Sequence, residues 1–236
     1  MTLTVQRIGQ FLRRRLDGEP SMDTLSLCNL AGRQLFTMHT WEWAVAPKTT
    51  ITINSGKSEV ELPKDFGRMV KVETSGSLLN ALVLTTPSHL LELETSIISM
   101  NNVGYWAAVV WKKPTDGCPM RPVLRVYPQI GTSDSLNLYY YSAWVEITDE
   151  NETISVPPFI EPLLLELCFA FAQGYDEHDI ADLNDRLARV QQSPVFQTAV
   201  MQDASVQDEL GEIRGGVTDS NRMWQSATII GGPYQV

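Results

Sequence analysis

The 236-residue chain lacks the features of a membrane-spanning or secreted protein. No run approaches the roughly 18 to 20 consecutive apolar residues that cross a bilayer as a helix. The N-terminal region is also unlike a secretory signal, because Arg13, Arg14 and Arg15 stand where an apolar segment would be required. We therefore expect a protein without membrane contact that acts in the cytoplasm or in a particle assembled there.

Cysteine is scarce, with three residues that are far apart in the sequence. Cys28, Cys118 and Cys168 are odd in number and contain no Cys-x-x-Cys pair, so neither a disulfide framework nor a zinc site is indicated. Cys28 and Cys168 stand in apolar, helix-like surroundings. We expect both to be buried as small hydrophobic side chains.

Basic residues are in the minority, since 18 Lys and Arg stand against 28 Asp and Glu and give a net charge of −10. Tight binding to nucleic acid needs a basic surface that displaces counterions from the phosphates. The one basic cluster, at residues 13–15, is better explained as the last turn of a helix, where cations offset the helix dipole. An acidic wall past which DNA slides without specific binding remains compatible with this charge.

Motifs of catalysis are missing from the sequence. It contains no GxSxG, no HExxH and no glycine-rich phosphate loop. The acidic run from Asp176 to Asp185 is the densest group of possible metal ligands, but its spacing does not fit an EF-hand and is typical of a capped, solvated helix start. We therefore predict no catalytic, cofactor-binding or metal-binding residue, and no cofactor. Two carboxylates acting across a cleft would leave no such motif, so a hydrolase stays an alternative.

Apolar residues recur at helical spacing at both ends of the chain. Val5, Ile8, Leu12 and Leu16 would line one face of an N-terminal helix. Residues 159–171 are apolar on nearly every side, which predicts the most buried helix of the fold. We expect these segments to pack into one bundle. The predicted helices cover residues 3–16, a segment from Ser21 or Asp23 that ends in residues 41–43, a segment from 159 that ends at Gly174, a helix capped by Asp176, and residues 194–210.

The middle of the chain alternates β-branched and polar residues between turn signals, which is typical of strands. A short helix is predicted over residues 87–98 among them, and the module as a whole is expected to be antiparallel. The predicted fold class is therefore α+β, with a discontinuous helical bundle (residues 1–46 and 156–210), an inserted antiparallel β-rich module (47–155) and an extended C-terminal tail (211–236). The predicted strands are residues 49–54, 58–62, 69–74, 81–85, 105–111, 123–127 and 136–141.

The C-terminal tail has little periodicity and is interrupted by Gly-Gly pairs, yet it carries large apolar side chains. Disordered, merely solubilising segments are poor in such residues. We therefore predict that the tail binds a partner, while packing against its own domain is the alternative. The candidate partner-binding residues are Met223, Trp224, Ile229, Ile230 and Tyr234.

Four short segments resemble the head-to-tail adaptor (connector) proteins of tailed phages. They are residues 29–33 (NLAGR) followed by 41–43 (WEW), residues 61–69 (ELPKDFGRM), residues 124–128 (LRVYP) and residues 136–141 (LNLYYY). In that family, two N-terminal helices end in a Trp-rich segment and lead into a β insertion, in which the last two of these segments are similar to paired late strands. The resemblance covers about residues 1–210, and no motif of the tail contributes to it.

The resemblance implies a structural virion protein rather than an enzyme. Such adaptors form homo-oligomeric rings of about a dozen copies, a dodecamer, between the portal protein and a tail or nozzle protein. They line the DNA ejection channel, which the DNA passes without specific binding, and a C-terminal extension docks on the portal. The expected location is the neck or tail of the virion, after assembly in the host cytoplasm.

Three other functions stay open at this point. The chain could be another neck or tail component, such as a completion protein or stopper. A cell-wall hydrolase would use Glu and Asp residues of the β-rich module. A binding module for a small ligand would be monomeric and would have a deep pocket.

Overall fold

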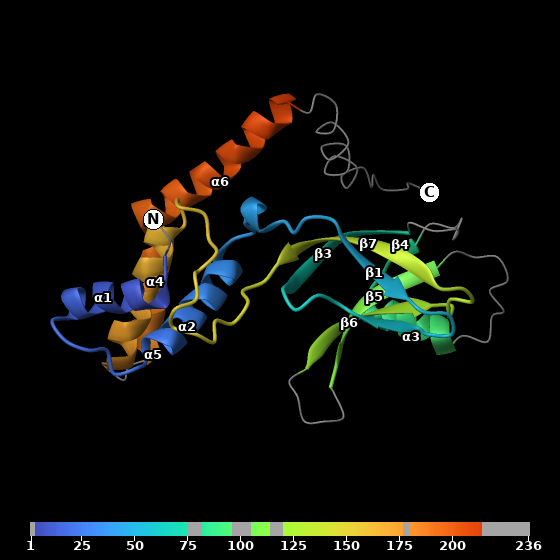
Figure 1. Ribbon diagram of the computed structural model, residues 1–236, viewed down its shortest axis with the longest axis horizontal. Coiled ribbons are helices and arrows are strands. Elements are labelled where there is room, and N and C mark those ends of the chain that lie inside the picture. Colours follow the sequence, from blue (N-terminus) through green and yellow to red (C-terminus); the bar gives the residue numbers. More distant parts are fainter. Residues whose placement is uncertain (1–2, 75–81, 96–104, 114–119, 177–179, 214–236) are drawn as a thin grey trace, which may run out of the picture.

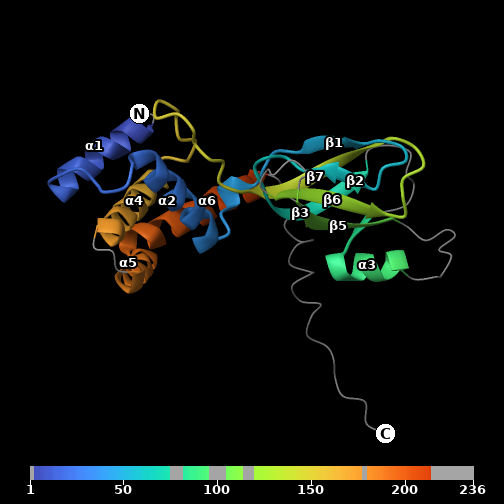
Figure 2. The same cartoon turned by 90° about the horizontal axis from the view of Figure 1, so that it is seen from below.

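The computed structural model describes residues 3–74, 82–95, 105–113, 120–176 and 180–213, and its fold is α+β as predicted. Figure 1 shows helices α1, α2, α4 and α5 gathered at one end and the strands at the other, while α6 extends away from both. The same separation is visible at right angles in Figure 2. These four helices and the strands therefore occupy different parts of the molecule, and the short helix α3 (Pro87–Thr95) lies with the strands.

Helix α1, Val5–Leu16, begins two residues later than predicted because Thr4 caps it. The Thr4 side chain accepts a hydrogen bond from the Arg7 N–H, and such a cap fixes the first residue of a helix. Val5, Ile8 and Leu12 form the predicted buried stripe. The basic last turn also has a structural role, because the Arg15 guanidinium lies 4.6 Å from the ring centroid of Phe169 on another helix.

Helices α2 (Thr24–Met38) and α4 (Glu161–Asp176) lie at the centre of the helical part. Helix α4 is buried on nearly every side, as its continuous apolar sequence predicts. The prediction that α4 ends at Gly174 is wrong, since it runs on to Asp176. Gly174 is instead a point of close approach, where an added Cβ would lie 2.7 Å from the side chain of Leu183 on the next helix.

Helices from both ends of the chain share one hydrophobic core. Helix α5 covers Ile180–Gln192 and helix α6 covers Pro194–Ile213, three residues beyond the predicted end at 210. Cys28 and Cys168 are both fully buried in this core, as predicted. Its largest fully buried members are Ile8, Leu12, Leu27, Leu35, Trp41 and Ile160.

The strands of the described residues form two sheets that enclose a second core. One sheet has the order β1-β7-β3 and the other β2-β6-β5-β4. Leu124 and Val126 of one sheet and Leu136 and Leu138 of the other belong to this core. The strands are β1 (Thr49–Ile53), β2 (Glu59–Glu61), β3 (Phe66–Thr74), β4 (Leu82–Leu84), β5 (Tyr105–Lys112), β6 (Arg121–Tyr127) and β7 (Asp134–Ser142).

Two expectations about strand pairing are wrong. The module is not wholly antiparallel, because β4 and β5 run parallel. Helix α3 (Pro87–Thr95) lies between them in the sequence, and a helical crossover is the usual connection between parallel neighbours. The late strands β6 and β7 do not pair with each other either. Each has buried residues on both faces and is an inner strand of its own sheet, so each needs two other neighbours.

The capped start of α2 makes a prediction about stability. Asp23 accepts a hydrogen bond from the Ser26 N–H at 2.8 Å, and its hydrogen bonds to Ser26 lower the pKa of the Asp23 carboxyl below its ordinary value of 3.8. A lowered pKa in the folded state contributes stability above the unfolded-state pKa, and this contribution is lost as the pH falls through the folded-state pKa.

We therefore expect Asp23→Ala to lower the free energy of unfolding by about 1 kcal/mol at neutral pH. The difference from the wild type should shrink as the pH falls below 3.8 in urea titrations followed by circular dichroism. Asp23→Asn keeps the capping oxygen without a titrating carboxyl and is the matched control, stable at neutral pH. A loss in Asp23→Ala that is the same at every pH would contradict the role of the charge.

Candidate functional site

The segments that carry the family resemblance near residues 29–33, 41–43 and 61–69 meet where the helical part joins the sheets. The chain crosses between the two parts twice, once after Trp43 and once after Ser142 on the way back from β7. We call the contacts around these two crossings the joint. They determine how the sheets are held relative to the helices.

Residues 29–33 on α2 hold the returning chain. The Asn29 amide oxygen accepts hydrogen bonds from the Trp144 indole N–H at 3.0 Å and from the Ile147 N–H at 2.9 Å, and its nitrogen donates to the Ile147 carbonyl at 3.0 Å. Gly32 lies directly beneath Trp144, since an added Cβ would lie 2.2 Å from the indole ring. Arg33 forms an ion pair with Glu146. The NLAGR segment is thus a docking site for residues 144–147.

Residues 41–43 close the core and start a short 3-10 helix, η1 (Glu42–Ala44). Trp41 is buried, and its indole N–H donates to the Leu35 carbonyl at 2.7 Å. Asp203, from α6, caps η1 and is only 2% exposed: its carboxylate accepts the Glu42 N–H at 2.8 Å and the Trp43 N–H at 3.0 Å. Carboxylates that accept backbone N–H groups in this way form strong hydrogen bonds. The last helix is thereby tied to the first crossing.

Residues 61–69 secure the end of β7. The Asp65 carboxylate accepts the Tyr140 hydroxyl at 3.0 Å and the Ser142 hydroxyl at 3.3 Å, and its backbone carbonyl accepts the Ala143 N–H at 2.7 Å. The Phe66 and Tyr140 rings pack with centroids 5.4 Å apart. Residues 62–66 (LPKDF), which we call the LP-x-DF segment, therefore hold the chain at the second crossing.

The three tyrosines of β7 each donate to a different carboxylate. Tyr139 donates to Glu73, Tyr140 to Asp65 and Tyr141 to Glu42. Burial raises the pKa of the Tyr140 and Tyr141 hydroxyls, and the hydrogen bond to Glu73 raises the pKa of Tyr139. All three hydroxyls stay protonated donors at neutral pH, which fits a structural role.

Two hollows lie beside the joint. One, of about 420 Å³, is lined by Arg33, His39 and Arg68 together with aromatic rings, and no carboxylate of the described residues lines it. The second, of about 360 Å³, is lined by apolar side chains with Asp65 and Glu152, and in the described part of the chain no Lys or Arg lines it. The two hollows thus differ in the sign of their charge.

Other chemical candidates of the sequence have structural partners. Within the acidic run, Asp182 pairs with Arg186 one turn later on α5, while residues 177–179 lie outside the described residues. The hydrogen bond to Cys28, together with burial, raises the pKa of the Cys168 thiol, so this thiol stays protonated and unreactive. In the part of the chain that the structure describes, no three His, Cys, Asp or Glu side chains gather as a metal site would require.

The predicted partner-binding residues lie outside the described residues. This holds for all five, which are Met223, Trp224, Ile229, Ile230 and Tyr234. Sequence reasoning missed Asn29 and Asp203 as individual residues that hold the joint. Asp203 did have a signal: it is an acid one turn after the buried Ala199 on the packed side of α6. Among the described helices, none is both long and apolar enough to cross a lipid bilayer.

Comparison with known proteins adds to this geometry. Residues 3–230 match the family model described as SU10 adaptor protein. The chain belongs to the SU10 adaptor protein family. Membership confirms the resemblance to phage adaptors, and the match extends past residue 210, where the resemblance was expected to end, into the tail. A search of curated proteins found no match. The SU10 adaptor family is one of structural virion proteins, which favours a non-enzymatic role.

The adaptor's joint can be tested at Gly32. Gly32→Ala should lower the free energy of unfolding by about 1–3 kcal/mol, because the new methyl group collides with Trp144 and overpacks the contact. Gly131→Ala is the matched control, since nothing lies within 4 Å of a Cβ there. Urea unfolding that shows equal stability for both variants would mean that Trp144 does not rest on α2.

The cap from α6 gives a second test. Asp203→Ala leaves two N–H groups without their acceptor and should cost about 2–4 kcal/mol in chemical unfolding. Asp203→Asn keeps one acceptor oxygen, so its free energy of unfolding should lie between those of the wild type and Asp203→Ala. Asp185→Ala, at an exposed position on α5, should change stability by about 0.5 kcal/mol or less. If Asp203→Ala were as stable as Asp185→Ala, α6 would not be held by this contact.

Proposed function

We propose that this SU10-family adaptor forms a ring between the portal and the tail of a tailed phage, with its copies lining the DNA channel. The observation that carries the proposal is the family match over residues 3–230. The ring, its number of copies (twelve by the resemblance), the portal and a tail or nozzle protein as partners, and assembly in the host cytoplasm are parts of the proposal.

The arrangement of the chain supports a two-part subunit. A helical bundle of residues 1–46 and 156–210 would build the body of the ring, and the inserted module of residues 47–155 would project from it toward a neighbouring protein. The joint supports this division, because Asn29, Asp65 and Asp203 each contact a crossing between the parts. A projecting module needs such a fixed joint if it is to meet its partner in one orientation.

The charge of the chain supports a channel wall. At a net charge of −10 per copy, a ring would present an acidic lumen to DNA. Like charges repel, so DNA would pass such a surface without adhering to it. No sequence-specific contact is part of the proposed role.

The tail of residues 211–236 is proposed to dock on the portal. Met223, Trp224, Ile229, Ile230 and Tyr234 are of the residue types that anchor protein interfaces. In a ring, every copy would contribute one tail, so a contact that is weak by itself would be repeated around the portal and the total affinity would rise steeply.

Deletion of residues 217–236 tests this docking. We expect the truncated protein to bind the portal about 100-fold more weakly or worse in co-sedimentation, because the repeated anchors are lost. Trp224→Ala should weaken binding in the same direction. Met201→Ala, which removes an exposed apolar side chain of α6 upstream of the tail, is the matched control and should bind normally.

Undiminished portal binding by the truncated protein would contradict tail docking. If neither the full chain nor the truncated protein bound a portal, the chain would be another neck or tail completion protein instead. Turnover of purified peptidoglycan by the full chain would favour the cell-wall hydrolase, and persistence as a monomer that binds a small ligand would favour the binding module.

A further inference from the structure

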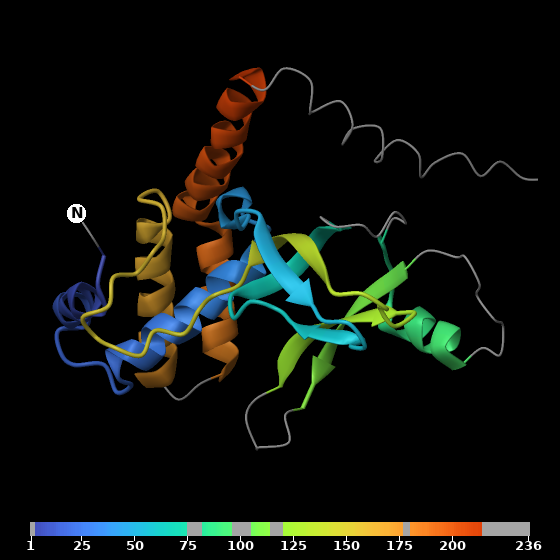
Figure 3. The same ribbon diagram turned by 45° about the vertical axis from the view of Figure 1, so that its right-hand side comes forward.

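The hairpin of β5 and β6 extends beyond the two sheets. Trp111 and Lys112, at the end of β5, pair in register with Pro122 and Arg121 at the start of β6. Figures 1 and 3 show this end of the hairpin pointing to the opposite side from α6. The hairpin end is therefore a protruding feature of the molecule.

Trp111 lies on the face of β5 that points toward the core, but its side chain is largely exposed. Alternate residues of β5 share one face, and both Ala107 and Val109 pack into the core between the sheets. Trp111 is the next residue on that face, yet 61% of it is exposed. Met120, just before β6, is 54% exposed. An exposed tryptophan on a protruding hairpin is the type of residue that anchors protein interfaces.

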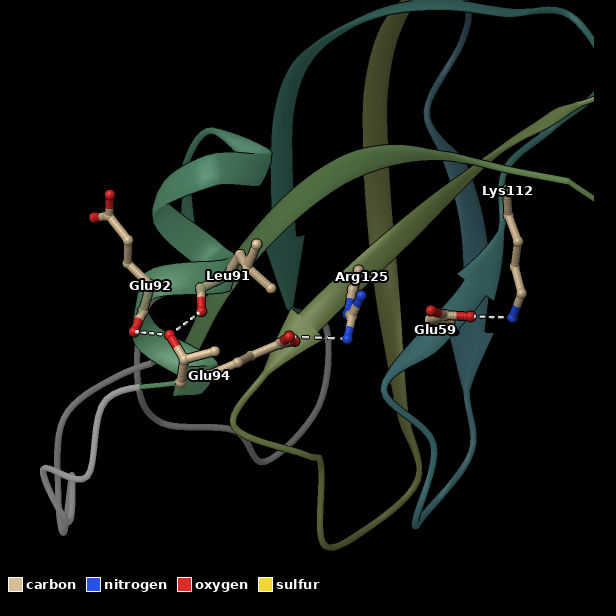
Figure 4. Close-up of polar contacts among 7 residues, drawn as sticks. Glu59, Leu91, Glu92, Glu94, Lys112 and Arg125 are labelled. Atoms are coloured by element: carbon tan, nitrogen blue, oxygen red, sulfur yellow. Dashed lines mark hydrogen bonds and ion pairs between the residues drawn. The ribbon is translucent and has the colours of Figure 1, made fainter.

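The hairpin end is basic on an acidic protein. Lys112 is paired with Glu59 on β2, and Figure 4 shows this contact together with the Glu94–Arg125 ion pair that holds α3 on the same sheet. Lys113 and Arg121 are exposed and form no ion pair within the described residues. A partner that covers Trp111 should therefore offer carboxylates beside an apolar hollow.

The second hollow beside the joint has both an apolar lining and carboxylates. Its walls include Trp43, Val45 and Val145, and the two valines are 45% and 54% exposed. Among the residues that the structure describes, Asp65 and Glu152 are its only charged lining residues, so its charge is opposite to that of the hairpin end. Its volume of about 360 Å³ is within the range of cavities that enclose organic groups of ring size.

We propose that Trp111 of one copy inserts into this acidic hollow of a second copy, with Lys113 and Arg121 facing Asp65 and Glu152. The proposal rests on the proposed ring and names the contact between its neighbours. A protrusion and a hollow on different surfaces of the same chain make a head-to-tail contact, and such contacts close into rings when the rotation permits.

Charge favours a second copy as the occupant. Two chains of net charge −10 repel each other overall, so a contact that brings oppositely charged patches together is favoured over other arrangements. The basic hairpin end and the acidic hollow are such a pair, and every copy carries both.

Cysteine cross-linking tests the contact. In a Cys118→Ser background, Trp111→Cys with Val145→Cys should yield a ladder of covalent oligomers when assembled protein, alone or on portals, is oxidised with copper-phenanthroline. Cys28 and Cys168 are fully buried and do not interfere. Leu91→Cys with Val145→Cys is the matched control: Leu91 is 57% exposed on α3, so it is equally accessible but should give no ladder.

Assembly measurements give an independent readout. Trp111→Ala should raise the concentration needed for ring formation by about 30-fold or more in analytical ultracentrifugation, as expected for an interface anchor, whereas Leu91→Ala should not. Glu152→Lys should also weaken assembly, and adding Lys113→Glu should restore it. Each variant alters an exposed or rim side chain, and an unchanged melting temperature would confirm that it folds.

The outcomes separate the contact from the proposed function. Normal ring formation by Trp111→Ala, together with the absence of a ladder from Trp111→Cys with Val145→Cys, would overturn the contact and leave the ring adaptor standing. Cross-links from position 111 to the portal instead of to a second copy would overturn it as well. If the wild type formed no ring with or without portals, the proposed function would fail and the contact with it.

Discussion

The side chain of Asn29 makes three hydrogen bonds to the chain that returns from the sheets, and the position of the β part depends on them. Such bonds are strong constraints here because a partly buried amide loses them only at the cost of unpaired polar groups. Together with the close contact between Gly32 and Trp144, these hydrogen bonds fix where the returning segment lies on α2. Asp203 fixes the other crossing from α6. Since contacts hold both crossings, they favour one orientation of the sheets relative to the helices.

The contacts of the joint explain what two of the short motifs of the family do in the structure. The NLAGR segment supplies the amide and the glycine that receive residues 144–147, and the LP-x-DF segment supplies the carboxylate that receives the end of β7. The side chains of Asn29 and Asp65 hold the chain where it returns from the sheets. They are what a structural adaptor needs if its two parts meet different neighbours in a fixed geometry.

Local features of the fold were predictable from the sequence, and long-range ones were not. The helix stripes and the cap at Asp23 depend on residues within a few positions of each other, so periodicity and capping rules place both ends of α1 and the capped start of α2 within about two residues. The end of α2 was predicted too late, since the helix stops at Met38. Strand pairing depends on distant partners, and the pairing of β6 with β7 that the resemblance implied is wrong. The joint was invisible for the same reason. Asn29 and Ile147 are 118 residues apart, and Asp203 and Glu42 are 161 residues apart.

Electron microscopy of purified portals mixed with excess protein is the direct test of the proposal that this acidic two-part chain assembles as a ring on a portal. We expect portals capped on one face by an added ring from which the β parts project. Bare portals beside monomers, at concentrations at which the protein is folded and in excess, would contradict it.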